Sequence, residues 1–205
     1  LWCREGMEVV YVVCTDGSKG SDDSEMTSER LVAIRKQEQL DAARVLGVKE
    51  VVFLGYEDAM LQPTLELRRD IAREIRRYRP DVLICGTPVR RLGGGGYLAH
   101  PDHLAAGEAA LSAVFPTARD RLTFPELLEE GLEPHKVREV WVLDKQDPDN
   151  YVDVTGYVEV AIEALKQHQT QVSGEDVDAH IKQWRSQTGQ KVGFQYAEAF
   201  KRLRL

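Results

Sequence analysis

The stretch YLAHPDHLAAGEAA holds two of the five histidines of this chain, His100 and His103, with Asp102 between them. Histidines three residues apart on a helix lie on one face, so both imidazoles can reach one ligand or one metal ion. A nearby carboxylate can accept a hydrogen bond from an imidazole and so fix its tautomer. The same residues are also typical of a plain helix start, with His100 as the N-cap and Pro101 in the first turn. A catalytic site and a capped helix are both open interpretations.

The histidine pair does not complete a metal site. A catalytic zinc ion has three protein ligands and one open position, and the rest of the sequence contains no second cluster of histidines with carboxylates. Of the other histidines, His168 lies at the end of a predicted helix, in LKQHQTQ, and is the best candidate for lining a pocket. His135 is expected on the surface, and His180 on the face of a helix. The pattern therefore indicates part of a site.

The elements around these residues predict an α/β fold. Apolar, β-branched runs, typical of strands covered on both faces, occur at 8–15, 50–56, 81–87 and 138–144. Helical patterns separate them. One begins with Ser28 as N-cap and ends at Gly47, one begins at Thr64 and is stopped by Pro80, and one begins at the histidine pair. This alternation predicts a doubly wound, mostly parallel sheet with helices on both faces.

The second half of the chain is less regular. Residues 151–155 predict a short strand, and helical segments are expected at 156–171, at 175–189 and over the final YAEAFKRLRL. No internal repeat or linker is found, so residues 1–205 are expected to form one domain. The opening LWCREG is typical of the end of a helix capped by Gly6, so we expect this domain to lack its first βα unit.

Two long loops follow predicted strands. In open α/β sheets, ligands bind beyond the carboxyl ends of the strands, and loops there that exceed the usual length of about two to six residues are commonly functional. The first loop, TDGSKGSDDSEMTSE, contains Asp16, and the second reaches the histidine pair through Gly93–Gly96. The four glycines match neither a Walker loop nor a dinucleotide fingerprint, so a flexible lid is the favoured interpretation.

Composition excludes several classes of protein. The 205 residues carry a net charge of −7, which argues against nucleic acid as a partner, because phosphate binding needs a concentrated basic face. No run is long and apolar enough to span a bilayer. The cysteines Cys3, Cys14 and Cys85 lack disulfide or zinc-ligand spacing and are expected to be free thiols, which favours a cytoplasmic location. A homo-oligomer is an open alternative.

Together, these segments resemble the LmbE/PIG-L-type zinc-dependent de-N-acetylases. The resemblance rests on VVYVVCTDGSKGS, IRKQEQLDAARVLGV, FLGYEDAML, HPDH, LKQHQTQ and YAEAF, in this order over nearly the whole chain. It implies a Rossmann-like α/β fold. It also implies that the protein hydrolyses the N-acetyl group of a small-molecule substrate, an N-acetylglucosamine-type amino-sugar conjugate.

The resemblance assigns roles within the HPDH motif. His103 would be a zinc ligand, and His100 would be the catalytic acid that stabilises the oxyanion. Asp102 would orient His100.

Three residues outside this motif are expected to bind the substrate, and the resemblance gives the role of the first. Arg35, from an R-x-x-E segment, would contact the acetyl or carboxylate end of the ligand, and Asp16 and His168 would line the site. On spacing alone, Arg35 is equally well placed for an ion pair with Glu38 or Asp41 on its own helix.

One family motif is not in the sequence. The family's first motif, His-Pro-Asp-Asp, would supply the other two zinc ligands and the general base, so we expect those groups from an absent N-terminal segment. The alternative hypothesis is a non-catalytic protein, a degenerate or truncated sugar-binding relative of the family. A preceding strand ending in His-Pro-Asp-Asp would favour the enzyme, and a genuine start at Leu1 would favour the binding protein.

Overall fold

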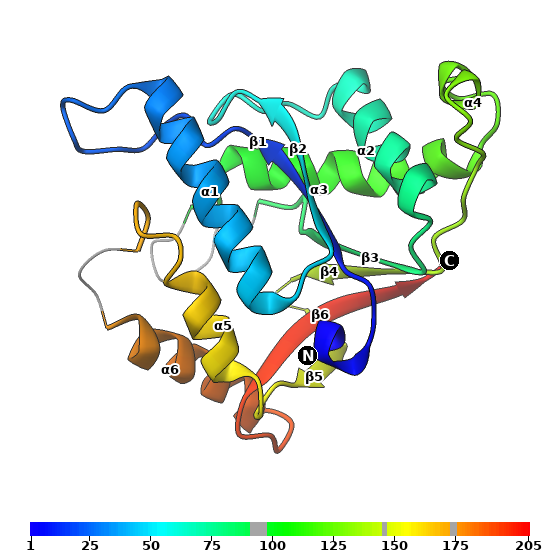
Figure 1. Ribbon diagram of the computed structural model, residues 1–205. Helices are drawn as coiled ribbons and strands as arrows, with labels where there is room; N and C mark the ends of the chain where they lie inside the picture. The colour runs from blue at the N-terminus through cyan, green and yellow to red at the C-terminus, as the bar shows by residue number, and fades with distance from the viewer. Residues whose placement is uncertain (91–97, 145–146, 173–175) are drawn as a thin grey trace. The chain divides into compact units, whose positions relative to one another are not determined.

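The computed structural model describes residues 1–90, 98–144, 147–172 and 176–205. Helices and strands alternate through most of the chain (Figure 1), which confirms the predicted α/β class. The chain forms two compact units: the first comprises residues 1–58 and 151–199, and the second comprises 59–150 and 200–205. The organisation as one domain stays a prediction, and the predicted lid, Gly93–Gly96, lies outside the described residues.

The first unit is built around a parallel strand pair. Strands β1 (Val10–Thr15) and β2 (Glu50–Tyr56) pair in parallel and are joined by helix α1 (Ser28–Leu46), as parallel pairing requires a crossover. Helix α1 packs against α5. The other elements are the 3-10 helix η1 (Trp2–Glu5), helix α5 (Val158–Leu165) and helix α6 (Val177–Gln190). A small apolar core contains Val154, Val158 and Ile162, with Ile181 of α6 packed against it.

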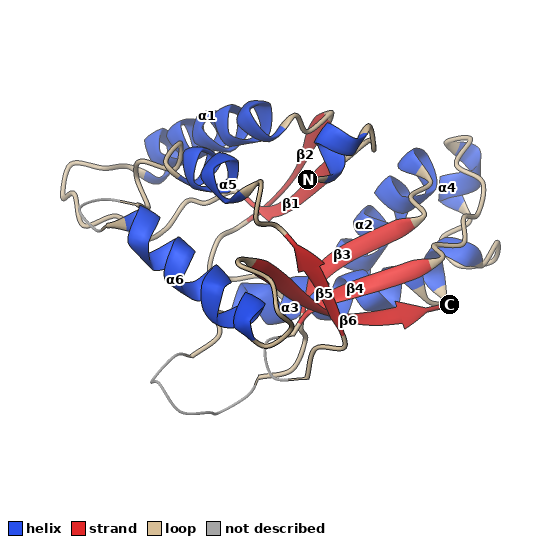
Figure 2. Cartoon of the chain, turned by 90° about the horizontal axis from the view of Figure 1, so that it is seen from below, coloured by secondary structure: helices blue, strands red, loops and turns tan. Residues whose placement is uncertain are grey.

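The second unit carries most of a four-stranded sheet (Figure 2). Its strands follow the order β3 (Val82–Gly86), β4 (Glu139–Leu143), β6 (Ala197–Arg204) and β5 (Asn150–Asp153). Strand β3 is parallel to β4, and β4 is antiparallel to β6. Helices α2 and α3 pack against each other, and α3 packs against β3. The elements are α2 (Leu65–Tyr78), β3 (Val82–Gly86), α3 (Pro101–Val114), η2 (Thr117–Arg119), α4 (Glu126–Glu129) and β4 (Glu139–Leu143). Along the chain, β5 (Asn150–Asp153) and β6 (Ala197–Arg204) each cross from one unit to the other.

The end of the chain corrects one prediction. The sequence predicts a helix over the last ten residues, but β6 (Ala197–Arg204) is a strand there. Its pairing with β4 brings the Arg202 guanidinium to 2.6 Å from the Glu139 carboxylate. The same pairing places the rings of Phe200 and Trp141 5.4 Å apart between centroids. These contacts join residues far apart in sequence and override the helix propensity of the segment.

The helix ends follow the predicted capping residues closely. Thr64 caps α2, and its hydroxyl accepts the N–H of Leu67. Gly47 ends α1 in the left-handed conformation, with φ 76°. The start of α1 differs by one residue, because the hydroxyl of Thr27 rather than Ser28 accepts the capping hydrogen bond.

The cysteines are free thiols, as predicted. Burial raises the pKa of Cys14 to about 11 and that of Cys85 to about 12. Among the helices of the described residues, none has the length and apolar character needed to cross a membrane.

Candidate active site

The HPDH motif forms the first turn of α3 in the second unit. His100 is the N-cap and Pro101 the first helical residue, a position where the missing N–H of proline costs no hydrogen bond. Both imidazoles of the motif are exposed, and the ring centroids of His100 and His103 lie 5.7 Å apart. The motif is therefore both a capped helix start and a pair of accessible imidazoles.

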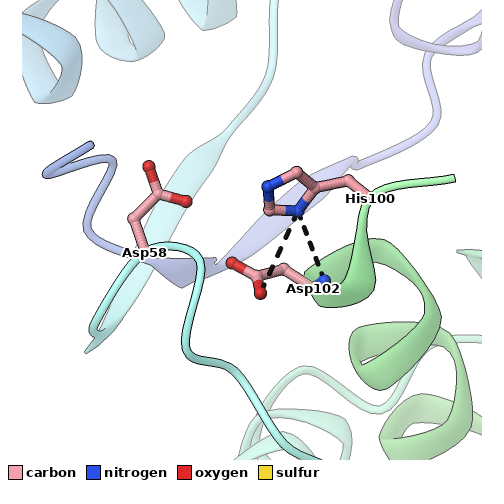
Figure 3. A group of neighbouring side chains, drawn as sticks. All are labelled: Asp58, His100 and Asp102. Atoms are coloured by element: carbon pink, nitrogen blue, oxygen red, sulfur yellow. Dashed lines mark hydrogen bonds and ion pairs between the residues drawn. The ribbon is translucent and has the colours of Figure 1, made fainter. Parts of the chain in front are cut away.

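The capping hydrogen bond determines which tautomer neutral His100 adopts. Its Nδ1 accepts the N–H of Asp102 at 3.3 Å (Figure 3). A ring nitrogen that accepts a hydrogen bond carries the lone pair, so the proton of the neutral ring lies on Nε2. Because the His100 side chain is 46% exposed, this Nε2–H is available to an oxygen atom of a ligand.

The carboxylate of Asp102 holds the loop after β2. It is 4% exposed and accepts the N–H groups of Ala59 at 2.7 Å and of Leu61 at 3.2 Å. Its closest oxygen lies 3.9 Å from Nδ1 of His100, which is beyond hydrogen-bonding distance. Asp102 thus orients His100 through its backbone N–H. A catalytic role for its carboxylate stays a prediction.

Gly107 allows α3 to approach the carboxyl end of β3. A Cβ atom at Gly107 would lie 2.5 Å from the carbonyl oxygen of Gly86, the last residue of β3. At Gly86 itself, a Cβ atom would make only an ordinary van der Waals contact, 3.5 Å from the carbonyl oxygen of His103. The close contact seats the motif at the strand end where open α/β folds bind ligands.

In the first unit, Arg35 of α1 holds the loop that follows β1. Its guanidinium donates to the carbonyl oxygens of Gly17 at 2.8 Å and Gly20 at 2.9 Å, and also to that of Lys19. The Asp58 carboxylate lies 3.5 Å from the same guanidinium. A planar guanidinium that binds several oxygens in this way defines the path of the loop.

The alternative interpretation of Arg35, an ion pair on its own helix, is wrong. Asp41 pairs with Arg44 at 2.5 Å, and Glu38 accepts hydrogen bonds from Thr170. The implied contact of Arg35 with a substrate stays a prediction.

Asp16 connects the carboxyl ends of β1 and β2. Its carboxylate accepts the N–H groups of Ser18 at 2.9 Å and of Asp58 at 3.1 Å. Partial burial acts to raise the pKa of Asp16, but these hydrogen bonds outweigh it, and the pKa is lowered. Asp58 received no role in the sequence analysis. The available signal was its position two residues after the end of β2, since Asp16 likewise lies just beyond the end of β1.

His168 lies in the turn after α5, in the first unit. Its N–H donates to the carbonyl oxygen of Leu165 at 3.1 Å, and its imidazole is half-buried. Burial lowers the pKa of the imidazole, and the negative charge of Glu38 opposes this shift without reversing it. The neutral ring, which can both donate and accept hydrogen bonds, is therefore favoured.

The donor types at the motif fit a zinc-like metal ion. Figure 3 shows His100 and Asp102 of the second unit, whose imidazole nitrogen and carboxylate oxygens are potential metal ligands. Imidazole nitrogens and carboxylate oxygens are usual zinc ligands. The Asp102 oxygens already accept N–H groups, and the role of His103 as a metal ligand stays a prediction.

Comparison with known proteins identifies the family. Residues 2–114 match the GlcNAc-PI de-N-acetylase (PIG-L) family. The chain belongs to this family. It is 31% identical, over 200 residues, to a diacetylchitobiose deacetylase from Thermococcus kodakarensis, and the match covers 96% of this chain and 72% of that protein. It is also 28% identical to a probable N-acetyl-alpha-D-glucosaminyl L-malate deacetylase 2 from Bacillus anthracis, over 83% of this chain and 71% of that protein.

Solved structures of this fold agree with the family. The N,N′-diacetylchitobiose deacetylase from Pyrococcus horikoshii, complexed with its inhibitor MPG, matches with a TM-score of 0.89 and 28% identity, covering 98% of this chain and 75% of that one. The fold also matches a 4-carboxy-2-hydroxymuconate hydratase from Pseudomonas putida, with a TM-score of 0.78 and 19% identity. The fold alone therefore does not determine which reaction a protein catalyses, because the reaction depends on the residues of its site.

Proposed function

We propose that this member of the PIG-L family hydrolyses the amide bond of an N-acetyl group on an N-acetylglucosamine-type conjugate. The observation that carries the proposal is the HPDH turn of α3, which exposes His100 and His103 at the carboxyl end of β3. The relatives named above are deacetylases of amino-sugar compounds, which supports the same substrate class.

We also propose that zinc is the cofactor and that His103 is one of its ligands. A bound divalent metal would lower the pKa of a water molecule and polarise the acetamide carbonyl. His103 suits this role because its imidazole is exposed and lies on the same turn as His100. The further ligands and the general base are expected from the His-Pro-Asp-Asp motif of the family.

The role proposed for His100 is to stabilise negative charge on the acetamide oxygen. With Nδ1 occupied by the N–H of Asp102, the ring presents Nε2–H as a donor. A fixed donor aimed at a developing oxyanion is worth about 10²–10³ in rate. The Asp102 carboxylate supports this geometry by holding Ala59 and Leu61 next to the first turn of α3.

Asp16, Arg35 and His168 are proposed as residues of the substrate-binding region. Asp16 and Arg35 would act by shaping the loop Gly17–Gly20. His168 would offer a neutral imidazole to a sugar hydroxyl. We also propose a cytoplasmic location, supported by the three free thiols.

The proposal is tested with three histidine variants of the full-length protein. His103→Ala is expected to lose bound zinc and amine release from N-acetylglucosaminyl compounds. His100→Ala is expected to keep zinc but to lose activity by about 10²–10³. His180→Ala is the control, because His180 is exposed on α6 and has no proposed role. If His103→Ala kept full zinc occupancy and activity, the assignment would be wrong. A wild-type protein that binds the sugars but releases no amine would favour the non-catalytic alternative.

A further inference from the structure

We infer that Glu38 is a positioning residue for His168, acting through the two hydrogen bonds that it accepts from Thr170. The inference rests on the proposed function, in which His168 binds the substrate. All three residues belong to the first unit.

Glu38 is a buried carboxylate that is held by hydrogen bonds. It lies on α1, is 7% exposed, and is four residues from buried Ala42 on the same helix face. Among the residues that the structure describes, no salt bridge includes Glu38, since Arg35, one turn earlier, is bound to the loop after β1. Burying a carboxylate is costly unless hydrogen bonds satisfy its oxygens. The free-energy cost of burying the Glu38 carboxylate is therefore offset by its hydrogen bonds with Thr170.

Both oxygens of Glu38 bind one residue of the turn after α5. Thr170 donates its N–H to Oε1 at 2.8 Å and its hydroxyl to Oε2 at 2.7 Å. Hydrogen bonds to an ionised group are short and strong, and two of them to one residue fix its orientation as well as its position. Thr170 is itself exposed, so packing alone does not hold it.

The conformation of this turn determines where His168 lies. The carbonyl oxygen of His168 accepts the N–H groups of Gln171 at 3.0 Å and of Val172 at 2.9 Å, which closes the turn around Thr170. A shift of Thr170 therefore moves the backbone that carries the imidazole. Glu38 is also close enough to act electrostatically on the ring. The carboxylate thus connects α1 to the His168 ring through the backbone of a single turn.

The matched variants are Thr170→Val and Thr170→Ser. Valine has nearly the shape of threonine but cannot donate to Oε2, whereas serine keeps both hydrogen bonds. Because Thr170 is exposed, neither substitution disturbs a packed core. The substrate is N,N′-diacetylchitobiose, and the measurements on the full-length protein are KM, kcat, the Kd for the sugar by calorimetry, and Tm.

Thr170→Val is expected to raise KM and Kd by up to about tenfold, with little change in kcat, because loss of one charge-assisted hydrogen bond lowers the population of the turn conformation that places His168 for binding. Thr170→Ser is expected to match the wild type. In a His168→Ala background, Thr170→Val is expected to have no further effect on Kd, because both residues then act through the same missing ring.

Unchanged KM and Kd in Thr170→Val would overturn the inference, and so would effects that simply add in the double variant. These results leave the proposed function standing if the wild type releases amine. A wild type that neither binds nor deacetylates any N-acetylglucosaminyl compound would overturn both.

Discussion

Gly107→Ala tests how the HPDH motif is held. Helix propensity alone predicts that this substitution in the middle of α3 stabilises the protein, by about 1 kcal/mol. The packing predicts the opposite, because the new Cβ would lie 2.5 Å from the carbonyl oxygen of Gly86 and 3.1 Å from its carbonyl carbon. Both are backbone atoms of β3, which cannot rotate away.

The net effect follows from these two contributions. Overpacking costs about 1–3 kcal/mol, and a contact this short with backbone belongs at the upper end. Subtracting the gain of about 1 kcal/mol in helix propensity from an overpacking cost of about 3 kcal/mol leaves a destabilisation of about 2 kcal/mol. For a chain of this size, that lowers Tm by about 4–8 °C. Relief of the clash would also displace the first turn of α3, so zinc binding through His103 is expected to weaken.

The assay is thermal unfolding, followed by circular dichroism and accompanied by metal analysis. Gly156→Ala is the matched control, because a Cβ there meets no atom within 4 Å, and a Gly→Ala change without a clash is neutral or stabilising. A Gly107→Ala protein with a Tm equal to or above that of the wild type would refute the reasoning. The close approach to β3 would then not be what seats α3.

Three further predictions concern other parts of the chain. Arg76 is 2% exposed and donates to backbone carbonyls between residues 117 and 132. The single ammonium group of lysine cannot make the several hydrogen bonds of the planar guanidinium. Arg76→Lys is therefore expected to lower the free energy of unfolding, measured in urea, by at least about 2 kcal/mol. Hydrogen bonds from Arg202 and Trp141 lower the pKa of Glu139 from 4.5 to about 2. The stability that ionised Glu139 provides is present above pH 4.5 and is lost as the pH falls toward 2. Glu139→Gln is therefore expected to flatten the acid side of the Tm–pH profile. A variant profile that runs parallel to that of the wild type would contradict this. Cys14 and Cys85, whose pKa values burial raises to about 11 and about 12, are expected to resist alkylation at neutral pH. Rapid labelling of either thiol in the folded protein would be inconsistent with that burial.

The sequence predicted the features that depend on neighbouring residues. The starts of α2 and α3 and the end of α1 were predicted from Thr64, the His100–Pro101 pair and Gly47. Each is a local capping signal, formed within a turn of the helix itself. The spacing within HPDH likewise predicted two imidazoles on one turn, and the structure places them there.

The roles of the carboxylates could not be predicted in this way. The spacing suggested that the Asp102 carboxylate binds His100, yet it accepts N–H groups more than 40 positions away, at Ala59 and Leu61. Glu38 was a candidate partner of Arg35, yet it binds a residue 132 positions away. A carboxylate accepts from whichever donor the fold brings near, and sequence spacing within one helix carries no information about that donor.

The sequence by itself thus determined the α/β class, the positions of most helices and strands, and the residues whose side chains could act in catalysis or binding. These features follow from local periodicity, capping and motif spacing. Only the tertiary structure decided that the last residues form β6 rather than a helix, that the Asp102 carboxylate accepts the N–H groups of Ala59 and Leu61, and that Glu38 binds Thr170 in the turn of His168. The physical reason is common to all three. The deciding hydrogen bonds, strand pairings and steric contacts form only once the chain has folded, and they compete successfully with local preference because each satisfies a group that folding removes from water.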